Sequence, residues 1–262
     1  MTESRQQRRA RQRAEAKQAA RLGLQRLISE KDLVQGWPAG SNTTIRLATG
    51  ADVEAMSSLV ELAGVALDEY VADGVRNDVV AGALRSGLRS GHDALLQDIA
   101  RVSTQASSSG DLRPMYLRSA LALVAERPGE GVLGTLLAYP PTHVVERYYQ
   151  AAAALGPREQ YKTALVGAVS LIKIKAVAVA PEAQDQRLGS ALLRHCEQVY
   201  RQCRFTLLYG QMPPARNLER FYAGNGFEVK EPEDYLDVWS IFGLHGGIHA
   251  DQGERLFAKW LK

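Results

Sequence analysis

The sequence predicts a mixed α/β (α+β) fold, in which a twisted sheet of six to seven strands has helices on both faces and several extra helices. Two strand-like apolar segments, Leu121–Glu126 and Val132–Tyr139, flank a Pro-Gly-Glu-Gly turn and predict a β-hairpin. Between residues 165 and 203, a β-branched segment is followed by a proline and then by helical spacing of apolar residues. This alternation of strand and helix patterns is typical of layered domains that combine both elements.

Composition narrows the class of protein. The 262 residues are 45% hydrophobic and 23% charged, as in ordinary globular proteins. No apolar run approaches the roughly 20 residues that span a bilayer, and no secretory signal is evident, so a cytoplasmic location without membrane contact is expected. Cys196 and Cys203 would lie roughly 10 Å apart along one helix, too far for a disulfide, and no metal site is expected.

The first part of the chain is basic. Up to Lys31 there are nine basic and three acidic residues, a net charge of +6, whereas the whole chain carries +3. Good helix formers fill Gln6–Ile28, which predicts a basic helix whose end packs on the body, and glycines at 36 and 40 predict a linker. A solvated helix is the preferred interpretation of residues 5–31, and nucleic-acid binding through them is an alternative.

The body begins with a strand at Thr44–Ala48 and a helix that reaches Ala63, capped by Thr49 or Asp52. Helical spacing continues through the region 64–114, where Ser103–Gly110 is expected to be a loop. The remaining expected elements are a helix at His143–Leu155, a strand at Phe205–Tyr209, a helix at Ala215–Ala223, and strands at Phe227–Val229 and Leu236–Ile241.

The chain is therefore divided into a basic extension with linker at 1–40, a main domain at 41–245 and an amphipathic C-terminal segment at 246–262. Helical insertions are expected at about 64–114 and 142–161, where they would form the walls of a substrate pocket. The apolar face of the C-terminal segment is either core or a subunit contact, so a homodimer is one option. That face comprises Leu256, Phe257, Trp260 and Leu261.

The segment Val177–Leu193 carries the most information about function. It has the order strand, proline, short polar loop with a glycine, and helix. A loop that opens a helix presents unpaired N–H groups and the positive end of the helix dipole, an arrangement that suits a pyrophosphate.

This segment resembles the acetyl-CoA signature of the GNAT acyltransferases, Val-x-Val-x-Pro followed by Gln/Arg-x-x-Gly-x-Gly/Ala. Spacing from Pro181 places the loop at 184–189, with Arg187 at the position of the first motif glycine, and a second register at 186–191 also fits the letters. The resemblance extends to Thr44–Ala63 and to about Leu121–Ile241. It implies acetyl-CoA as the co-substrate. The implied cofactor-binding residues are Val177, Ala178, Val179, Gln184, Asp185, Gln186, Arg187, Leu188, Gly189, Ser190 and Asn217.

The effect of Arg187 on phosphate binding depends on its backbone conformation, and two conformations are considered. If its backbone needs a positive φ, a Cβ would hinder the approach of a phosphate. If the backbone there is already helical, which is the preferred alternative, the side chain adds a cation beside the phosphates.

A second part of the resemblance lies in Asn217–Phe227, which is similar to the Phe-Tyr-x-x-x-Gly-Phe ending of the family. It implies that Tyr222 protonates the departing CoA thiolate as a general acid. The asparagine that the family usually places seven residues earlier is Ala215 here, and Asn217 is out of register.

The family often places a carboxylate on the strand before the loop, but this strand has Lys173 and Lys175 instead. A general base could come from Glu126, Asp68, Glu69 or a water chain. The predicted function is transfer of an acetyl or other acyl group from acyl-CoA to an amine acceptor of unknown type. The alternatives are a GNAT-like module that binds acyl-CoA without turnover, and a nucleic-acid-associated protein.

Overall fold

A computed structural model describes residues 27–40, 42–109, 111–213 and 218–261. The elements in chain order are α2 (Glu30–Gln35), β1 (Trp37–Pro38), β2 (Thr44–Leu47), η1 (Gly50–Asp52), α3 (Val53–Leu62), α4 (Glu69–Arg76), α5 (Gly82–Ser90), α6 (His92–Ser109), α7 (Arg113–Ser119), β3 (Leu121–Arg127), β4 (Gly131–Tyr139), α8 (Thr142–Ala151), η2 (Ala152–Leu155), α9 (Pro157–Ser170), β5 (Leu171–Val179), η3 (Pro181–Ala183), α10 (Leu188–Gln202), β6 (Leu207–Met212), α11 (Glu219–Gly224), β7 (Glu228–Val229), β8 (Tyr235–Asp237), α12 (Trp239–Phe242), β9 (Gly247–His249) and β10 (Arg255–Trp260).

The main sheet has the strand order β1-β2-β3-β4-β5-β6-β10-β7, and β8 and β9 form a separate two-stranded sheet. In the main sheet only β5 and β6 are parallel. The predicted fold class is confirmed. The main sheet has eight strands and not six or seven, because the C-terminal segment forms β10 inside it and β1 extends the opposite edge.

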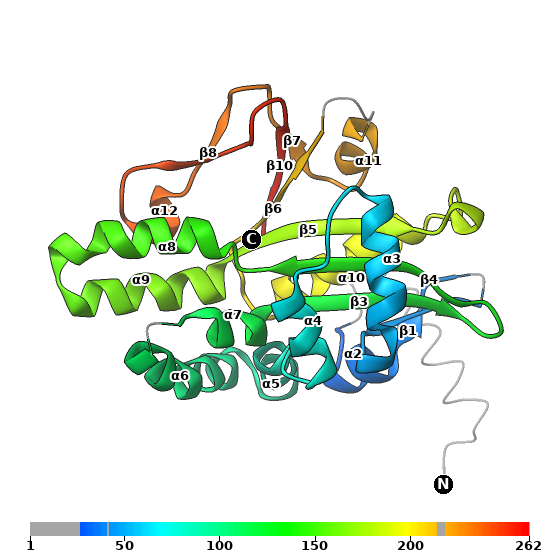
Figure 1. Ribbon diagram of the computed structural model, residues 1–262, viewed down its shortest axis with the longest axis horizontal. Helices are drawn as coiled ribbons and strands as arrows, with labels where there is room; N and C mark the ends of the chain where they lie inside the picture. Colours follow the sequence, from blue (N-terminus) through cyan, green and yellow to red (C-terminus); the bar gives the residue numbers. More distant parts are fainter. Residues whose placement is uncertain (1–26, 41, 110, 214–217, 262) are drawn as a thin grey trace, which may run out of the picture.

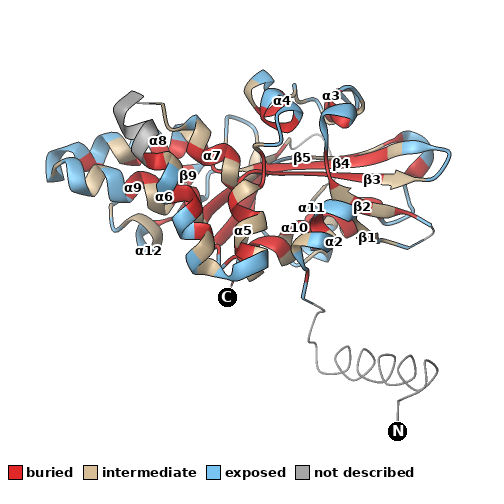
Figure 2. Cartoon of the chain, turned by 90° about the horizontal axis from the view of Figure 1, so that it is seen from below, coloured by how far each residue is buried: buried red, intermediate tan, exposed pale blue. Residues whose placement is uncertain are grey.

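Helices cover both faces of this sheet. α3 packs against β4 and β5 on one face, and α10 packs against β3, β4 and β5 on the other. Figure 2 shows the sheet edge-on, with α3 and α4 on one side and α10 and α2 on the other. The buried core is continuous across these layers, and β3 is fully buried from Leu121 to Ala125.

The helical insertions extend the molecule beyond one end of the sheet. α5, α6 and α7 pack together, and α8 and α9 form a helical pair beside them (Figure 1). α6 continues to Ser109, so the expected loop at Ser103–Gly110 is wrong for residues 103–109. Ser103 is buried and its Oγ bonds to the Ala100 carbonyl at 2.7 Å, so packing and hydrogen bonding stabilise a segment whose composition is typical of loops.

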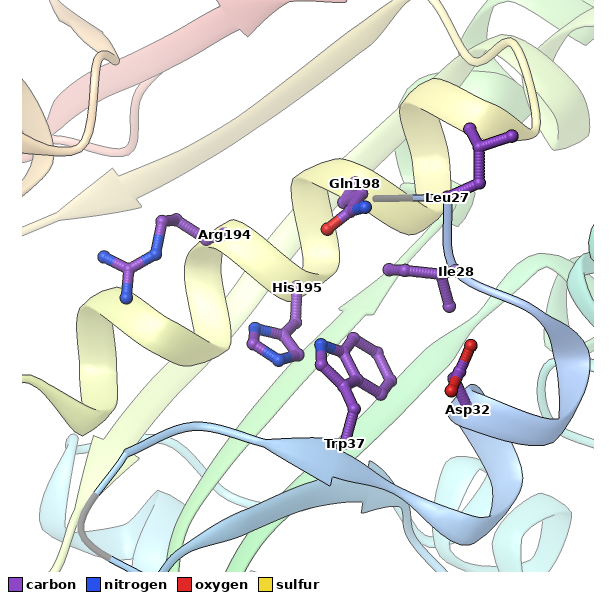
Figure 3. A pocket seen from close by; sticks show the side chains of 7 residues that line it. All are labelled: Leu27, Ile28, Asp32, Trp37, Arg194, His195 and Gln198. Carbon is purple, nitrogen blue, oxygen red and sulfur yellow. The ribbon is translucent and has the colours of Figure 1, made fainter. Parts of the chain in front are cut away.

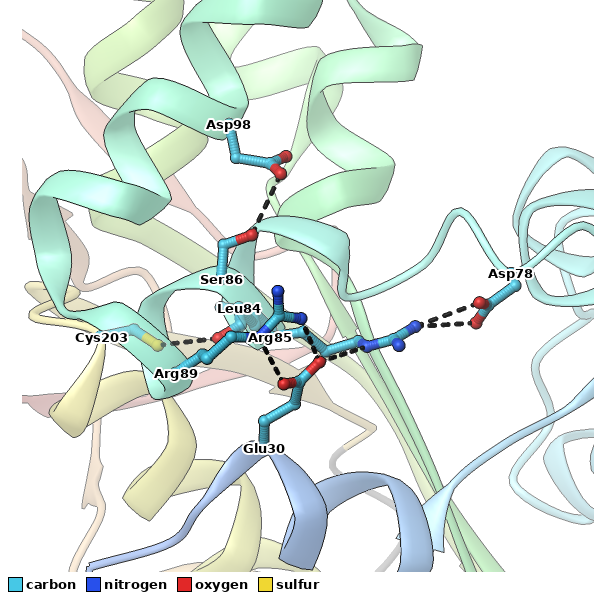
Figure 4. A network of polar contacts seen from close by, with 8 residues as sticks. All are labelled: Glu30, Asp78, Leu84, Arg85, Ser86, Arg89, Asp98 and Cys203. Atoms are coloured by element: carbon cyan, nitrogen blue, oxygen red, sulfur yellow. Dashed lines mark hydrogen bonds and ion pairs between the residues drawn. The ribbon is translucent and has the colours of Figure 1, made fainter.

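Ion pairs fix the N-terminal end of the described chain. Glu30 on α2 accepts hydrogen bonds from Arg89 and Arg85 on α5, and Arg85 also pairs with Asp78 at 3.1 Å (Figure 4). The bonds from Arg89 lower the pKa of the Glu30 carboxyl below its usual value. Leu27–Ser29 is not helical, so the expected helix is wrong at its end, and its other residues lie outside the described chain.

Four other expected boundaries are wrong. Residues 165–170 belong to α9 and not to a strand, because a short apolar run fits either element and Pro157 begins a helix there. The linker expected between Gly36 and Gly40 contains β1, which pairs with β2. β6 begins at Leu207 and runs to Met212, and β8 ends at Asp237 before the short helix α12. Cys196 and Cys203 are buried free thiols, as predicted.

Candidate active site

The sheet splits between β5 and β6. β5 pairs with β4 up to Val179, but it pairs with β6 only from Leu171 to Ile174. Beyond Ile174 the two parallel strands separate, while β6 stays paired with β10 on its other edge as far as Met212. Within the described chain, the β5 edge from Lys175 to Val179 is therefore not paired with another strand on this side, although the Val179 carbonyl accepts a hydrogen bond from Gln184 Nε2 at 3.4 Å. An extended ligand can pair with such an edge as an added strand would.

A bulge lies at the start of this split. Leu137 is opposite Ala176 while Ala138 is opposite Ile174, so Lys175 is an extra residue on β5. Bulges bend a strand and increase its local twist. We infer that the bulge helps to turn β5 away from β6.

The split forms a groove of about 460 Å³. Its walls come from the loop after α3, from β5, from the end of β6, from α11 and from the start of β10. The lining residues are Leu62, Ala63, Gly64, Val65, Lys175, Ala176, Val177, Ala178, Val179, Gln184, Gln211, Pro213, Leu218, Phe221, Tyr222 and Glu254. Of the predicted cofactor residues, Val177, Ala178, Val179 and Gln184 are therefore brought together in the groove with Tyr222.

The loop between β5 and α10 provides backbone donors at one end of the groove. Within the described chain, no acceptor takes up the N–H groups of residues 185–190. α10 is fifteen residues long, so these donors coincide with the positive end of its dipole. An anion bound here would be held by backbone groups and not by a dedicated side chain.

Arg187 is the N-cap of α10 with φ 62° and ψ 19°, a left-handed conformation. The preferred expectation of a helical backbone at this position is wrong, and a glycine would fit with less strain. Asp185 is also left-handed, with φ 61°. The fold retains the backbone shape that a glycine motif provides, although both positions carry side chains.

The other predicted loop residues have different surroundings. Gln186 accepts a hydrogen bond from Arg127 Nη2 at 2.6 Å, which ties the loop to the β3–β4 hairpin. Leu188 packs in a small buried cluster, so only its backbone is available to a ligand. Ser190 Oγ accepts from Asn225 Nδ2 at 3.1 Å, and this bond joins α10 to α11. Gly189 lies against Phe221, and Asn217 is outside the described chain.

Tyr222 lies in the wall of the groove and is 7% exposed. Burial raises the pKa of its hydroxyl above the usual range, so the group keeps its proton at neutral pH. Its ring stacks on Phe257 with centroids 3.6 Å apart and an interplanar angle of 15°. No hydrogen bond from the Tyr222 hydroxyl to another described residue is present, which leaves the proton available to a ligand.

Phe257 was not singled out as a site residue by the sequence. It lies on β10 opposite Gly210 of β6, where a Cβ would come within 2.2 Å of the Phe257 ring and 2.9 Å of the Ile174 carbonyl oxygen. Gly210 thus lets Phe257 lie across β6 and support Tyr222.

The three carboxylates that the sequence suggested as general bases do not line the groove. Glu126 pairs with Arg46 at 2.6 Å, Glu69 pairs with Arg76 at 2.7 Å, and Asp68 does not line the groove. Glu254, immediately before β10, does line it and has no ion pair within the described residues. Nothing in the sequence around Glu254 distinguishes it from a surface carboxylate before β10 is placed.

A separate cavity of about 260 Å³ lies between α10 and the N-terminal segment (Figure 3). The His195 ring stacks on Trp37 at 4.1 Å, Nδ1 bonds to the Ala191 carbonyl at 2.6 Å, and Nε2 is buried without a partner in the described chain. Burial lowers the pKa of His195 to about 4. We regard this cavity as structural.

The described residues contain no cluster of three or more potential metal ligands, and His245 and His249 form none. Among the helices that the structure describes, none has the length and apolar character to cross a membrane. Most of the basic region 5–31 lies outside the described chain, so nucleic-acid binding through it stays a prediction.

The structure has an α/β fold with a groove between two diverging parallel strands. Residues 120–229 match the family model of the acetyltransferase (GNAT) domain. This segment of the chain is therefore similar to GNAT acetyltransferase domains. The match includes the splayed strands, the loop, α10 and Tyr222, but not β10.

Solved structures with similar folds include Ard1 from Thermoplasma volcanium, at 13% identity and a TM-score of 0.42 over 84% of this chain and 99% of that one. A putative acetyltransferase, yncA, from Salmonella typhimurium, solved with its cofactor acetyl-CoA, is 16% identical with a TM-score of 0.43 over 85% and 95% of the two chains. The ribosomal-protein-S18-alanine N-acetyltransferase from Escherichia coli is 12% identical with a TM-score of 0.41 over 84% and 94%. No curated protein matches the chain. At such low sequence identity and TM-score, these similarities do not indicate which substrate this protein uses.

Proposed function

We propose that this protein transfers an acetyl group from acetyl-CoA to an amine by direct attack. The observation that supports this most strongly is the position of three features around one groove: the unpaired edge of β5, the free amides at the start of α10, and the protonated Tyr222 hydroxyl. The pantetheine arm would pair with residues 175–179, and the pyrophosphate would bind the amides of residues 185–190. Arg187 would add a cation at the edge of this anion site.

In the reaction, the amine nitrogen attacks the thioester carbonyl, so that a C–N bond forms and the C–S bond breaks. Tyr222 donates its proton to the departing thiolate, which is otherwise a costly charge in a partly buried groove. The attacking ammonium must first lose a proton, and Glu254 is the carboxylate in the groove that can accept it, directly or through water.

The test is calorimetric titration with acetyl-CoA of the natural protein and of Gly189→Trp. Residue 189 lies in the first turn of α10 against Phe221, so an indole there would cover the free amides. We expect micromolar affinity that is lost in Gly189→Trp. Gly224→Trp is the matched control, because nothing lies within 4 Å of the Cβ position at this exposed glycine. The absence of binding to acetyl-CoA and to longer acyl-CoAs would refute the proposal.

The left-handed Arg187 and the absence of a carboxylate on β5 favour a second candidate, a module that binds acyl-CoA without transferring the acyl group. The two candidates share the groove and differ in turnover. Release of CoA thiol in the presence of an amine, dependent on Tyr222, supports the enzyme, whereas tight binding without release for any amine supports the module.

A further inference from the structure

One end of the groove lies at the apex of the split, where the pairing of β5 with β6 stops. The last pair of opposite residues is Ile174 on β5 and Gly210 on β6. Gln211 is the next residue of β6 and lines the groove, as does Lys175 on the strand that diverges from it. The amides of residues 185–190 follow the other end of β5. A ligand that pairs with β5 and places its phosphates at those amides therefore has its opposite end beside Gln211.

Gln211 and Tyr222 reach the groove from opposite faces of the sheet. Phe257 on β10 lies opposite Gly210, and its ring fills the space that a side chain at residue 210 would take. Tyr222 stacks on that ring, so it lies on the face to which residue 210 points. Successive residues of a strand point to opposite faces, so Gln211 points to the other face. A group bound at the apex of the split is therefore flanked by Tyr222 on one face and by the Gln211 amide on the other.

The amide of Gln211 is held in one orientation by Lys173. The Lys173 ammonium on β5 donates a hydrogen bond to Gln211 Oε1 on β6. An ammonium has donors and no acceptor, so it bonds to the oxygen of the amide and not to its nitrogen. Gln211 Oε1 is thereby occupied, and Gln211 Nε2 has no acceptor among the described residues. The wall of the groove thus contains a neutral amide donor whose orientation is set by a neighbouring charge.

The charges around Lys173 oppose the effect of its burial. Burial and the nearby Lys175 lower the pKa of Lys173, whereas the carboxylates of Asp251 and Glu254 act in the opposite direction and favour the ammonium. Among the described residues, Lys173 forms no ion pair and its ammonium bonds only to Gln211. A partly buried ammonium is costly without such a partner, so the bond should persist when a ligand enters the groove.

The end of acetyl-CoA that reaches the apex of the split is the thioester, which presents a sulfur and a carbonyl oxygen. Resting on the proposed acetyl transfer, we propose that Gln211 Nε2 donates a hydrogen bond to the acyl oxygen, and that Lys173 positions the amide for this bond. The sulfur then lies toward Tyr222 on the opposite face. Negative charge develops on the acyl oxygen when the amine attacks, and a preorganised donor aimed at that oxygen stabilises the transition state. Gln211 is thus a catalytic residue and Lys173 a positioning residue.

The first measurement is the infrared stretching frequency of the thioester carbonyl in bound acetyl-CoA, labelled with a heavy isotope at the acetyl carbonyl carbon. This readout needs no acceptor amine. A hydrogen bond to the oxygen weakens the C=O bond, so the frequency in the natural protein should lie below that of free acetyl-CoA. Gln211→Met removes the donor, and the frequency should return toward the free value. Gln150→Met, on the exposed face of α8, is the matched control and should leave the frequency unchanged.

Binding of S-ethyl-CoA, a thioether without the carbonyl oxygen, gives an independent measurement. One neutral hydrogen bond contributes about two- to tenfold to an affinity. By calorimetry, the natural protein and Gln150→Met should prefer acetyl-CoA to S-ethyl-CoA by that factor, and Gln211→Met and Gln211→Glu should lose the preference. Glutamate keeps an acceptor for Lys173 but has no amide donor, so Gln211→Glu tests the donor even if the methionine variant does not fold.

Lys173→Met tests the positioning role. It frees the Gln211 amide to rotate, so the carbonyl frequency should rise part of the way toward the free value. Lys173→Arg keeps a cationic donor that has no acceptor, and it should restore the frequency of the natural protein. Replacement of a partly buried ammonium by methionine should not lower the melting temperature. A residue with only a structural role would change the melting temperature and not the carbonyl frequency.

The outcomes separate this inference from the proposed function. If acetyl-CoA binds and its carbonyl frequency is the same in the natural protein and in both Gln211 variants, the role of Gln211 is overturned while the proposed cofactor site stands. If the Gln211 variants change the frequency and Lys173→Met does not, the positioning role of Lys173 is overturned. If acetyl-CoA does not bind the natural protein, the proposed function fails and this inference fails with it.

Discussion

The groove at the split strands and the cavity at Trp37 and His195 show how burial acts on two titratable side chains with opposite consequences. In both places burial favours the neutral form, which raises the pKa of Tyr222 and lowers that of His195. For Tyr222 the neutral form carries the proton that the proposed reaction uses. For His195 the neutral form has lost a proton, so the same effect makes the fold sensitive to acid.

The surroundings explain why only one of these hollows is a candidate active site. The groove has free backbone donors and acceptors from β5 and the α10 loop, which a ligand can reach. In the cavity, Trp37 covers His195, and the orphan Nε2 is buried. The following predictions test this contrast.

The largest effect is expected for Tyr222→Phe. Loss of a general acid typically lowers the rate by about 10²–10⁴-fold, so kcat should fall within this range. The ring that stacks on Phe257 is retained, so the Kd for acetyl-CoA should stay within a few-fold of that of the natural protein. Steady-state kinetics beside calorimetry measures both. An unchanged kcat would show that Tyr222 is only a packing residue.

The next effect is the acid sensitivity that His195 imposes. Its pKa is about 4 in the folded protein and about 6.5 in an unfolded chain, so the unfolded state takes up the proton first as pH falls. The free energy of unfolding should be constant above about pH 6.5 and fall between there and about pH 4, by about 2 kcal/mol at pH 5. His143, whose pKa is also lowered, adds to the loss in this window.

His195→Phe should remove most of this loss, because phenylalanine keeps the stack on Trp37 and does not titrate. Urea unfolding at pH 7 and pH 5 measures the difference, with His249→Gln on the exposed end of β9 as the control. An equal acid response in the natural protein and His195→Phe would mean that His195 is accessible to protons in the folded state.

A smaller effect is expected for Gly210→Ala. The new Cβ would displace the Phe257 ring, and overpacking of this kind costs about 1–3 kcal/mol. Because Tyr222 rests on Phe257, kcat should fall more than the affinity for acetyl-CoA changes. Gly224→Ala, where a Cβ meets nothing within 4 Å, should leave both unchanged. If Gly210→Ala lowers stability but not kcat, Phe257 does not position Tyr222.

The two walls of the groove differ in how far the sequence predicted them. The strand, proline and loop at 177–189 form a local pattern, so this wall, its position before α10 and Tyr222 on the next helix could be predicted. Glu254 lines the groove and Phe257 stacks on Tyr222 only because β10 inserts between β6 and β7, a pairing between distant segments. No local pattern encodes it. The left-handed backbone at Arg187 likewise depends on the loop as a whole.

The smallest effect is expected for Arg187→Gly. This substitution tests whether the loop binds the phosphates of acetyl-CoA through its backbone. A non-glycine residue in the left-handed region costs about 1 kcal/mol, so the glycine should stabilise the fold by up to that amount, less the entropy that glycine adds to the unfolded chain. If the amides of residues 185–190 supply most of the anion binding, the Kd for acetyl-CoA should change only a few-fold. Arg187→Lys, which keeps the charge and the strain, is the matched comparison. If Arg187→Gly lowers the affinity for acetyl-CoA more than tenfold and Arg187→Lys does not, the positive charge at residue 187 contributes to binding in place of the motif glycine. The groove would then depend on the side chain of Arg187 as well as on that of Tyr222.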